Sequence, residues 1–229
     1  MDSHFEAELE SLKQRLLTMA NHAATAVSRA MQALLQRDDA LAQQVKQNDR
    51  VIDQFEVEID DLAMQQLTKA PLATDLRLVT VAIKIAHNLE RIGDEAAKIA
   101  KRAAALSKEP PVQIQLDIST MADLTMDMLK TALAAFGQRD PALARSILPR
   151  DKEVDLFNMQ IHRILAQYMV EHPDTIKRCL QWMVVSKSLE RIADHATNIA
   201  EDVVYLCAAQ DIRHTGAKGG KILSEMLTC

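Results

Sequence analysis

Apolar side chains recur at every third or fourth position along two long stretches of the chain. The first stretch contains Leu78, Val81, Ile85, Leu89, Ile92, Ala96, Ile99, Ala103 and Leu106, and the second contains Leu189, Ile192, Ala196, Ile199, Val203 and Leu206. On an α-helix, steps of three and four place side chains on one face. The pattern therefore predicts two long helices, each packed against its neighbours at a shallow angle.

The prolines indicate where the helices end. Proline inside a helix is unfavourable by about 3 kcal/mol, so proline positions separate helical segments. The separators are Pro71, Pro110, Pro111, Pro141, Pro149 and Pro173, together with Gly137. They predict six helices at residues 3–36, 39–68, 72–107, 113–137, 141–171 and 174–209. Pro149 falls within the first turns of the fifth segment, so we expect that helix to start after it.

The second half of the chain repeats the first. Gln36-Arg37-Asp38 returns as Gln138-Arg139-Asp140, and Leu89-Glu90-Arg91-Ile92 returns as Leu189-Glu190-Arg191-Ile192. The offset is 102 in the first pair and 100 in the second, which places a two-residue difference in length inside the third helix. Between 88–100 and 188–200, eight of thirteen positions are identical. The order is the same in both halves, so the chain is a tandem duplication.

These patterns predict an all-α fold of two tandem, duplicated antiparallel three-helix bundles. Short connections make consecutive helices antiparallel, and at 1.5 Å per residue the helices would be about 40–50 Å long. We expect the first bundle at residues 1–108, the second at 112–210 and a polar C-terminal tail at 211–229.

Composition excludes several classes of protein. The net charge is −5 and no basic face is evident, so nucleic-acid binding is not expected. No signal peptide is expected, and the apolar runs are too short to insert into a membrane. Three cysteines without C-x-x-C spacing fit a reducing compartment. We therefore expect a cytoplasmic protein that reaches a membrane only through a partner.

Acidic residues spaced four apart are the candidate chemistry. Four such pairs stand at equivalent positions of the two halves: Asp49/Asp53, Glu90/Asp94, Asp151/Asp155 and Glu190/Asp194. Each pair places two carboxylates on one helix face, where like charges repel by about 0.2–0.5 kcal/mol. A hard cation with oxygen ligands would reverse that sign. Counted from the helix ends, the pairs of neighbouring helices lie about 18–21 Å below the same end of each bundle. The sequence thus predicts two metal sites of four carboxylates each.

The alternative is an ordinary solvated face, because Glu90 and Asp94 point away from the apolar positions of their helix. Identity between the halves is concentrated at these carboxylates, which favours a site. A ferritin-like di-iron centre is excluded, since it needs Glu-x-x-His and none occurs. No H-E-x-x-H, P-loop or G-x-S-x-G sequence is present, so no enzymatic activity is expected. His22 could donate one nitrogen, although a lone helical histidine is more often structural.

The duplicated Leu-Glu-Arg-Ile-x-Asp sequence and the Asp-x-x-x-Asp of the second and fifth helices resemble the PhoU family. Residues 74–79 (Thr-Asp-Leu-Arg-Leu-Val) and 210–214 (Gln-Asp-Ile-Arg-His) add to the resemblance, which spans the chain. The family comprises accessory proteins of phosphate transport. The resemblance implies a commonly dimeric cytoplasmic protein with metal at Glu90/Asp94 and Glu190/Asp194 and the other aspartates nearby. Ala193 departs from Gly93 and could make the two sites unequal.

The resemblance further implies a non-enzymatic negative regulator of the phosphate-starvation response and of phosphate uptake. Its expected partners are a PhoR-type sensor histidine kinase and the PstB-type ATPase subunit of a phosphate ABC transporter. The alternatives are a metal-binding or metal-storage helical protein and a purely structural adaptor. The pattern does not distinguish Fe, Zn, Mn, Mg and Ca as the metal.

Overall fold

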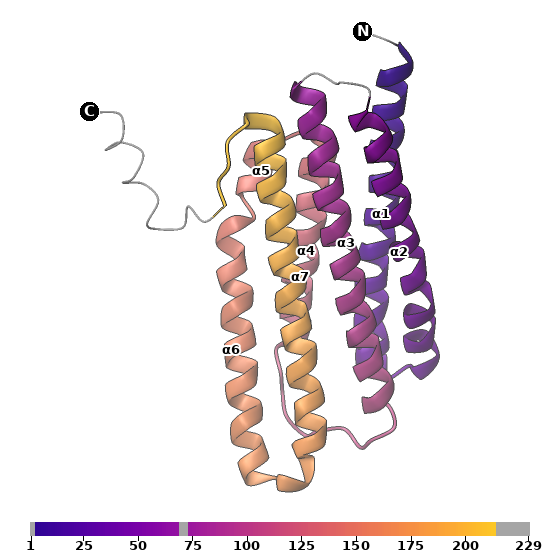
Figure 1. The fold of residues 1–229 in the computed structure, drawn as a ribbon. Helices are drawn as coiled ribbons and strands as arrows, with labels where there is room; N and C mark the ends of the chain where they lie inside the picture. Colours follow the sequence, from indigo (N-terminus) through magenta and orange to yellow (C-terminus); the bar gives the residue numbers. More distant parts are fainter. Residues whose placement is uncertain (1–2, 69–72, 214–229) are drawn as a thin grey trace, which may run out of the picture.

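The computed structural model describes residues 3–68 and 73–213, and within these ranges all regular structure is helical (Figure 1). The prediction of an all-α fold is confirmed. The elements of the first half are α1 (Ser3–Gln36), α2 (Asp39–Leu67) and α3 (Ala73–Leu106). Those of the second half are α4 (Ile118–Gln138), α5 (Pro141–Arg145), α6 (Leu148–Glu171), the 3-10 turn η1 (Pro173–Thr175) and α7 (Ile176–Ala208).

The duplicated Gln-Arg-Asp sequence forms the same turn in both halves. Arg37 and Arg139 both have positive φ, 57° and 53°, which is the left-handed conformation that ends a helix. The aspartate after each arginine then caps the next helix: Asp38 Oδ1 accepts from the Leu41 amide at 3.0 Å, and Asp140 Oδ1 accepts from two amides of α5. The repeated tripeptide therefore specifies a tight antiparallel connection.

The fourth helix begins at Ile118, so the predicted start at residue 113 is wrong. The reason lies in the pattern after the two prolines. Val112, Ile114 and Leu116 alternate with polar residues and are partly buried, whereas the glutamines between them are exposed. Alternation with a period of two is typical of an extended chain, and Val112 and Leu116 pack against the core in that form.

The fifth predicted segment is also divided in the structure. α5 ends at Arg145, and α6 begins at Leu148 with Pro149 in its first turn. The expectation that this helix starts after Pro149 is therefore wrong by two residues. Proline is tolerated there because the first amides of a helix have no partner within it.

The two halves are joined along α3 and α7, which lie side by side at the centre of the molecule (Figure 1). In the first half α1, α2 and α3 pack together, and in the second α4, α6 and α7 do so. α3 and α7 are antiparallel: Lys84 pairs with Asp202 at 3.2 Å near one end, and Arg102 donates to Gln181 at 3.0 Å near the other. One hydrophobic core continues through both halves, so the division at residues 108 and 112 stays a prediction.

Candidate functional site

Gly93 brings the backbone of α3 close to α2 at the level of the predicted carboxylates. A Cβ at this position would lie 2.8 Å from Ile52 Cδ1 and 3.3 Å from Asp49 Oδ1. Ile52 is buried, whereas Asp49 one turn earlier is less so. Because residue 93 has no side chain, Asp49 of α2 can lie directly against the backbone of α3. Asp94 is the next residue along α3.

In the first half, carboxylates of α2 and α3 repel one another across this contact. Loss of solvent around Asp49, followed by repulsion from Asp53 and Asp94, raises its pKa from 3.8 to about 6. Burial and then the charge of Asp94 also raise the pKa of Glu90. Asp49 is therefore close enough to Asp53 and Asp94 for their charges to raise its pKa, and Glu90 is close enough to Asp94.

The second half repeats this arrangement between α6 and α7. Loss of solvent and then repulsion from Glu190, Asp151 and Asp155 raise the pKa of Asp194 to about 6. Burial and the charge of Asp155 likewise raise the pKa of Asp151. One difference is that Thr197 Oγ1 donates to Asp151 Oδ1 at 3.3 Å, which opposes the rise. Alanine occupies the equivalent position 97 in the first half.

Burial within each group is graded. The Glu90 and Glu190 side chains are only 17% and 13% exposed, whereas Asp53 and Asp155 are exposed. Each group is therefore buried on its glutamate side and open to solvent on the side of Asp53 or Asp155. Metal binding by all eight stays a prediction.

Basic side chains partly neutralise both groups, in different ways. Arg91 Nε lies 3.2 Å from Glu90 Oε2, and Arg91 Nη1 lies 3.5 Å from Asp94 Oδ2. In the second half Lys187 Nζ lies 2.6 Å from Glu190, while Arg191 turns away to Glu95 of α3. Glu90 Oε2 is buried and accepts no hydrogen bond, so its neighbour Arg91 contributes charge alone, and a metal ion that displaced Arg91 would find an oxygen ligand there.

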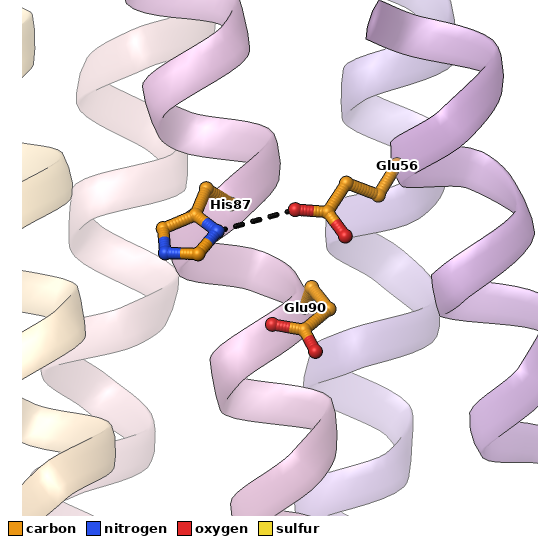
Figure 2. Close-up of side chains that lie close together, drawn as sticks. All are labelled: Glu56, His87 and Glu90. Carbon is orange, nitrogen blue, oxygen red and sulfur yellow. Dashed lines mark hydrogen bonds and ion pairs between the residues drawn. The ribbon is translucent and has the colours of Figure 1, made fainter.

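A second cluster, which the repeat pattern does not predict, shares Glu90 with the first group and consists of Glu56, His87 and Glu90 (Figure 2). Glu56 of α2 and His87 and Glu90 of α3 each offer one ligand atom, and these atoms lie within 4.8 Å of one another. His87 Nδ1 and Glu56 Oε1 are 3.2 Å apart. Among the described residues this is the set of three metal-ligating atoms with such spacing, and of the eight predicted ligands it includes only Glu90.

The sequence does carry a signal for this cluster. Glu56 lies three residues after Asp53 and His87 lies three before Glu90, so each extends an acidic pair along its own helix face. Both positions differ in the second half, where Asn158 and Lys187 occupy them. Identity between the halves cannot reveal residues that only one half contains.

Two further histidines, His22 and His195, lie elsewhere. The His22 ring packs 5.4 Å from the Phe55 ring, which fits its structural interpretation. His195 Nδ1 lies 2.9 Å from Asn88 Oδ1 between α3 and α7. Neither contact adds a nitrogen ligand to the carboxylate groups.

Comparison with known proteins now decides the family. The PhoU domain matches residues 16–103 and 118–203, one match in each half of the chain. The chain belongs to the PhoU family. Among the described residues, no helix is long and apolar enough to cross a membrane.

Relatives and solved structures of this family match nearly the whole chain. A phosphate-specific transport system accessory protein PhoU homolog from Pseudomonas putida is 40% identical over 95% of this chain and 86% of its own. The PhoU of Escherichia coli strain K12 is 35% identical over 94% and 90%. The crystal structure of PhoU from Pseudomonas aeruginosa, 40% identical, superposes with a TM-score of 0.88 over 90% of this chain and 100% of that one. PhoU from Streptococcus pneumoniae, 28% identical, gives 0.84 over 90% and 98%.

Proposed function

We propose that this chain is a non-enzymatic accessory regulator of phosphate transport. The observation that carries the proposal is the PhoU domain match in both halves, with relatives named as accessory proteins of the phosphate-specific transport system. In this proposal the protein is cytoplasmic and homodimeric. It restrains the phosphate-starvation response and phosphate uptake when phosphate is plentiful.

Its proposed partners are the phosphate-sensing histidine kinase and the ATPase subunit of the phosphate ABC transporter. The long rigid helices offer faces for docking. A protein that binds one state of a partner more tightly than another shifts that partner toward the favoured state, by the difference in binding free energy. Regulation of this kind needs no catalytic group.

The carboxylate groups of both halves would serve this function by holding cations. The candidate ligands are Asp49, Asp53, Glu90 and Asp94 in the first half and Asp151, Asp155, Glu190 and Asp194 in the second. A bound divalent cation would supply positive charge that offsets their mutual repulsion. The same groups could instead contact basic surfaces on a partner.

Deletion of the gene tests the regulatory proposal. Alkaline phosphatase activity is measured in cells growing with abundant phosphate, with and without the gene, because this enzyme reports the starvation response. We expect high activity in the deletion strain and low activity after complementation. Constant low activity would contradict the regulator.

A double substitution tests the role of the first carboxylate pair. Glu90→Gln with Asp94→Asn keeps the side-chain shapes but removes two charges. Under the metal hypothesis this variant loses cation uptake in the first half. Unchanged metal stoichiometry combined with weaker partner binding would show that these carboxylates contact a partner directly.

A metal-storage protein is the second candidate, and the cluster of Glu56, His87 and Glu90 is the observation that favours it. Purified protein would then become coloured and redox-active after loading with iron. An inert, colourless preparation would dismiss storage and leave regulation as the function.

A further inference from the structure

We propose that Glu56, His87 and Glu90 form a mixed nitrogen–oxygen site for a divalent transition-metal ion of the Zn²⁺ and Co²⁺ class, present in the first half only. The site shares Glu90 with the acidic group described above but takes its other ligands from outside it. The inference concerns metal binding by the purified chain, so it holds or fails independently of the regulatory function.

The ligand set suits such an ion. Zn²⁺ takes imidazole nitrogen at about 2.0–2.1 Å and carboxylate oxygen at about 2.0–2.2 Å, and catalytic or open sites combine three protein ligands with water. Two ligands on a tetrahedron of that size are about 3.4 Å apart. His87 Nδ1 and Glu56 Oε1 are already 3.2 Å apart.

Only the third ligand has to move. All three ligand atoms lie within 4.8 Å of one another, so Glu90 needs a shift of at most about 1.4 Å to reach the tetrahedral spacing of about 3.4 Å. Glutamate reaches such positions by rotation of its own side chain. The helices hold the Cα atoms, since α2 and α3 are packed through Ile52 and Gly93 at the next turn.

Burial gives the site one protected and one open side. The Glu90 side chain is 17% exposed and that of Glu56 is 26% exposed, whereas His87 is 57% exposed. A cation would thus rest on the buried carboxylate and remain reachable from water through the histidine. The buried Glu90 Oε2 accepts no hydrogen bond, and Arg91 Nε lies 3.2 Å from it, so a metal ion at this oxygen would take the place of the Arg91 guanidinium.

The second half has different residues at two of the three ligand positions. Lys187 stands where the first half has His87, and its ammonium lies 2.6 Å from Glu190. Asn158 stands where the first half has Glu56, and its Oδ1 accepts a hydrogen bond from Ser186. Each half thus places a side-chain cation beside its glutamate, Arg91 at Glu90 and Lys187 at Glu190. At the two positions that differ, the first half has an imidazole and a second carboxylate, which together can recruit a metal ion from solution.

The test is titration of the full-length protein with Zn²⁺ and with Co²⁺, measured by calorimetry and by the visible absorption of tetrahedral Co²⁺. His87→Lys and Glu56→Asn install the residues that the second half naturally carries. Since even indirect supporting residues change metal affinity by about 10–100-fold, loss of a direct ligand should lower it by at least about 100-fold. His172→Asn, which alters an exposed histidine remote from the cluster, is the matched control and should leave the affinity unchanged.

A gain-of-site variant makes the test independent of folding defects. Asn158→Glu with Lys187→His copies the first-half ligands beside Glu190 and should add a second bound Co²⁺ per chain. The proposal is wrong if His87→Lys retains wild-type Co²⁺ affinity and spectrum. It is also wrong if Asp94→Asn abolishes Co²⁺ binding while His87→Lys does not, since the ion would then belong to the acidic group.

Discussion

His195 Nδ1 lies 2.9 Å from Asn88 Oδ1, across the contact between α7 and α3. The equivalent positions one repeat away are Glu95 and Ser188, and these two are also hydrogen-bonded. Asn88 of α3 contacts His195 of α7, and the equivalent residue of α7, Ser188, contacts the equivalent residue of α3, Glu95. Such reciprocal contacts are typical of a two-fold interface. The duplicated halves pack like the subunits of a dimer.

This internal symmetry fixes the position of both acidic groups. The midpoint of the relation falls beside Ile92 in α3 and Ile192 in α7, which are buried at the centre of the molecule. Glu90 and Asp94 flank the first and Glu190 and Asp194 flank the second. The two carboxylate groups therefore lie at the same height, one on each side of the contact between the halves.

Asp49→Asn should stabilise the protein in the absence of metal. The pKa of Asp49 is raised in the folded state from 3.8 to about 6, so folding keeps a proton that the unfolded chain releases. That cost is absent below pH 3.8, grows as the pH rises to about 6, and then stays constant. With allowance for solvent screening of this partly exposed group, we expect a gain of about 1 kcal/mol at pH 7.

Urea unfolding with a chelator present, at pH 7 and near pH 4, measures this effect. The difference between Asp49→Asn and wild type should shrink to a small fraction of its pH 7 value at the lower pH. Addition of a cation that binds the acidic group should reverse the order at pH 7. A variant less stable than wild type in chelator would mean that Asp49 is not repelled by its neighbours.

Gly93→Ala should act through Ile52. A Cβ at residue 93 meets Ile52 Cδ1 at 2.8 Å, whereas the second half pairs Ala193 with the smaller Val154, both buried. Alanine gains about 1 kcal/mol of helix propensity over glycine. In wild type that gain should be cancelled by the displacement of Ile52, but in an Ile52→Val background it should be realised.

A double-mutant cycle by urea unfolding measures this coupling. Ile52→Val alone should cost about 0.5–1.5 kcal/mol. Together with Gly93→Ala it should show an interaction energy of at least about 0.5 kcal/mol in the stabilising direction. If the two free-energy changes were strictly additive, residues 93 and 52 would not be coupled through packing.

Exchange of the residues at positions 97 and 197 should shift the pKa values of Asp49 and Asp151 in opposite directions. The Thr197 hydroxyl favours the charged form of Asp151, and Ala97 offers no such bond to Asp49. Thr197→Ala should therefore raise the pKa of Asp151, and Ala97→Thr should lower that of Asp49. Carboxyl NMR titration of the two variants checks this, with Thr131→Ala, a threonine bonded only to its own helix, as the control. Unaltered titration of both aspartates would remove the hydroxyl as the source of the difference.

The duplication makes most of the fold predictable. The repeated spacing of apolar residues predicts the buried face of each long helix, and the repeated Gln-Arg-Asp sequence predicts the turn that follows. Both are local patterns that can be read from the sequence. Proline positions alone do not predict the linker before α4, because they indicate only where a helix stops. The alternation of Val112, Ile114 and Leu116 indicates the extended chain that leads into α4. Glu56 and His87 escape prediction because a site confined to one half leaves no trace in a comparison of the two.

Glu95→Ala should destabilise the contact between the two halves strongly. Burial by itself raises the pKa of Glu95, but hydrogen bonds from Lys98, Ser188 and Arg191 outweigh burial and hold the pKa below its usual value. The Glu95 side chain is 5% exposed, with Lys98 at 2.9 Å and Arg191 at 3.2 Å. Lys98 and Arg191 are about half exposed, so their charges stay solvated when Glu95 is removed. Loss of the three hydrogen bonds, two of them to charged groups, should cost about 2–4 kcal/mol.

The stability difference between wild type and Glu95→Ala should depend on pH. A carboxylate with a lowered pKa stabilises the fold above its unfolded-state pKa, 4.5 here, and that contribution is lost as the pH falls through the folded-state pKa. The free energies of unfolding of wild type and variant should therefore differ most at neutral pH and converge in acid. Lys98→Ala, which removes the exposed partner, should cost only about 0–1 kcal/mol and serves as the control. Equal losses from the two variants would show that the contact between Arg191 and Glu95 adds nothing to the stability of the interface between the halves.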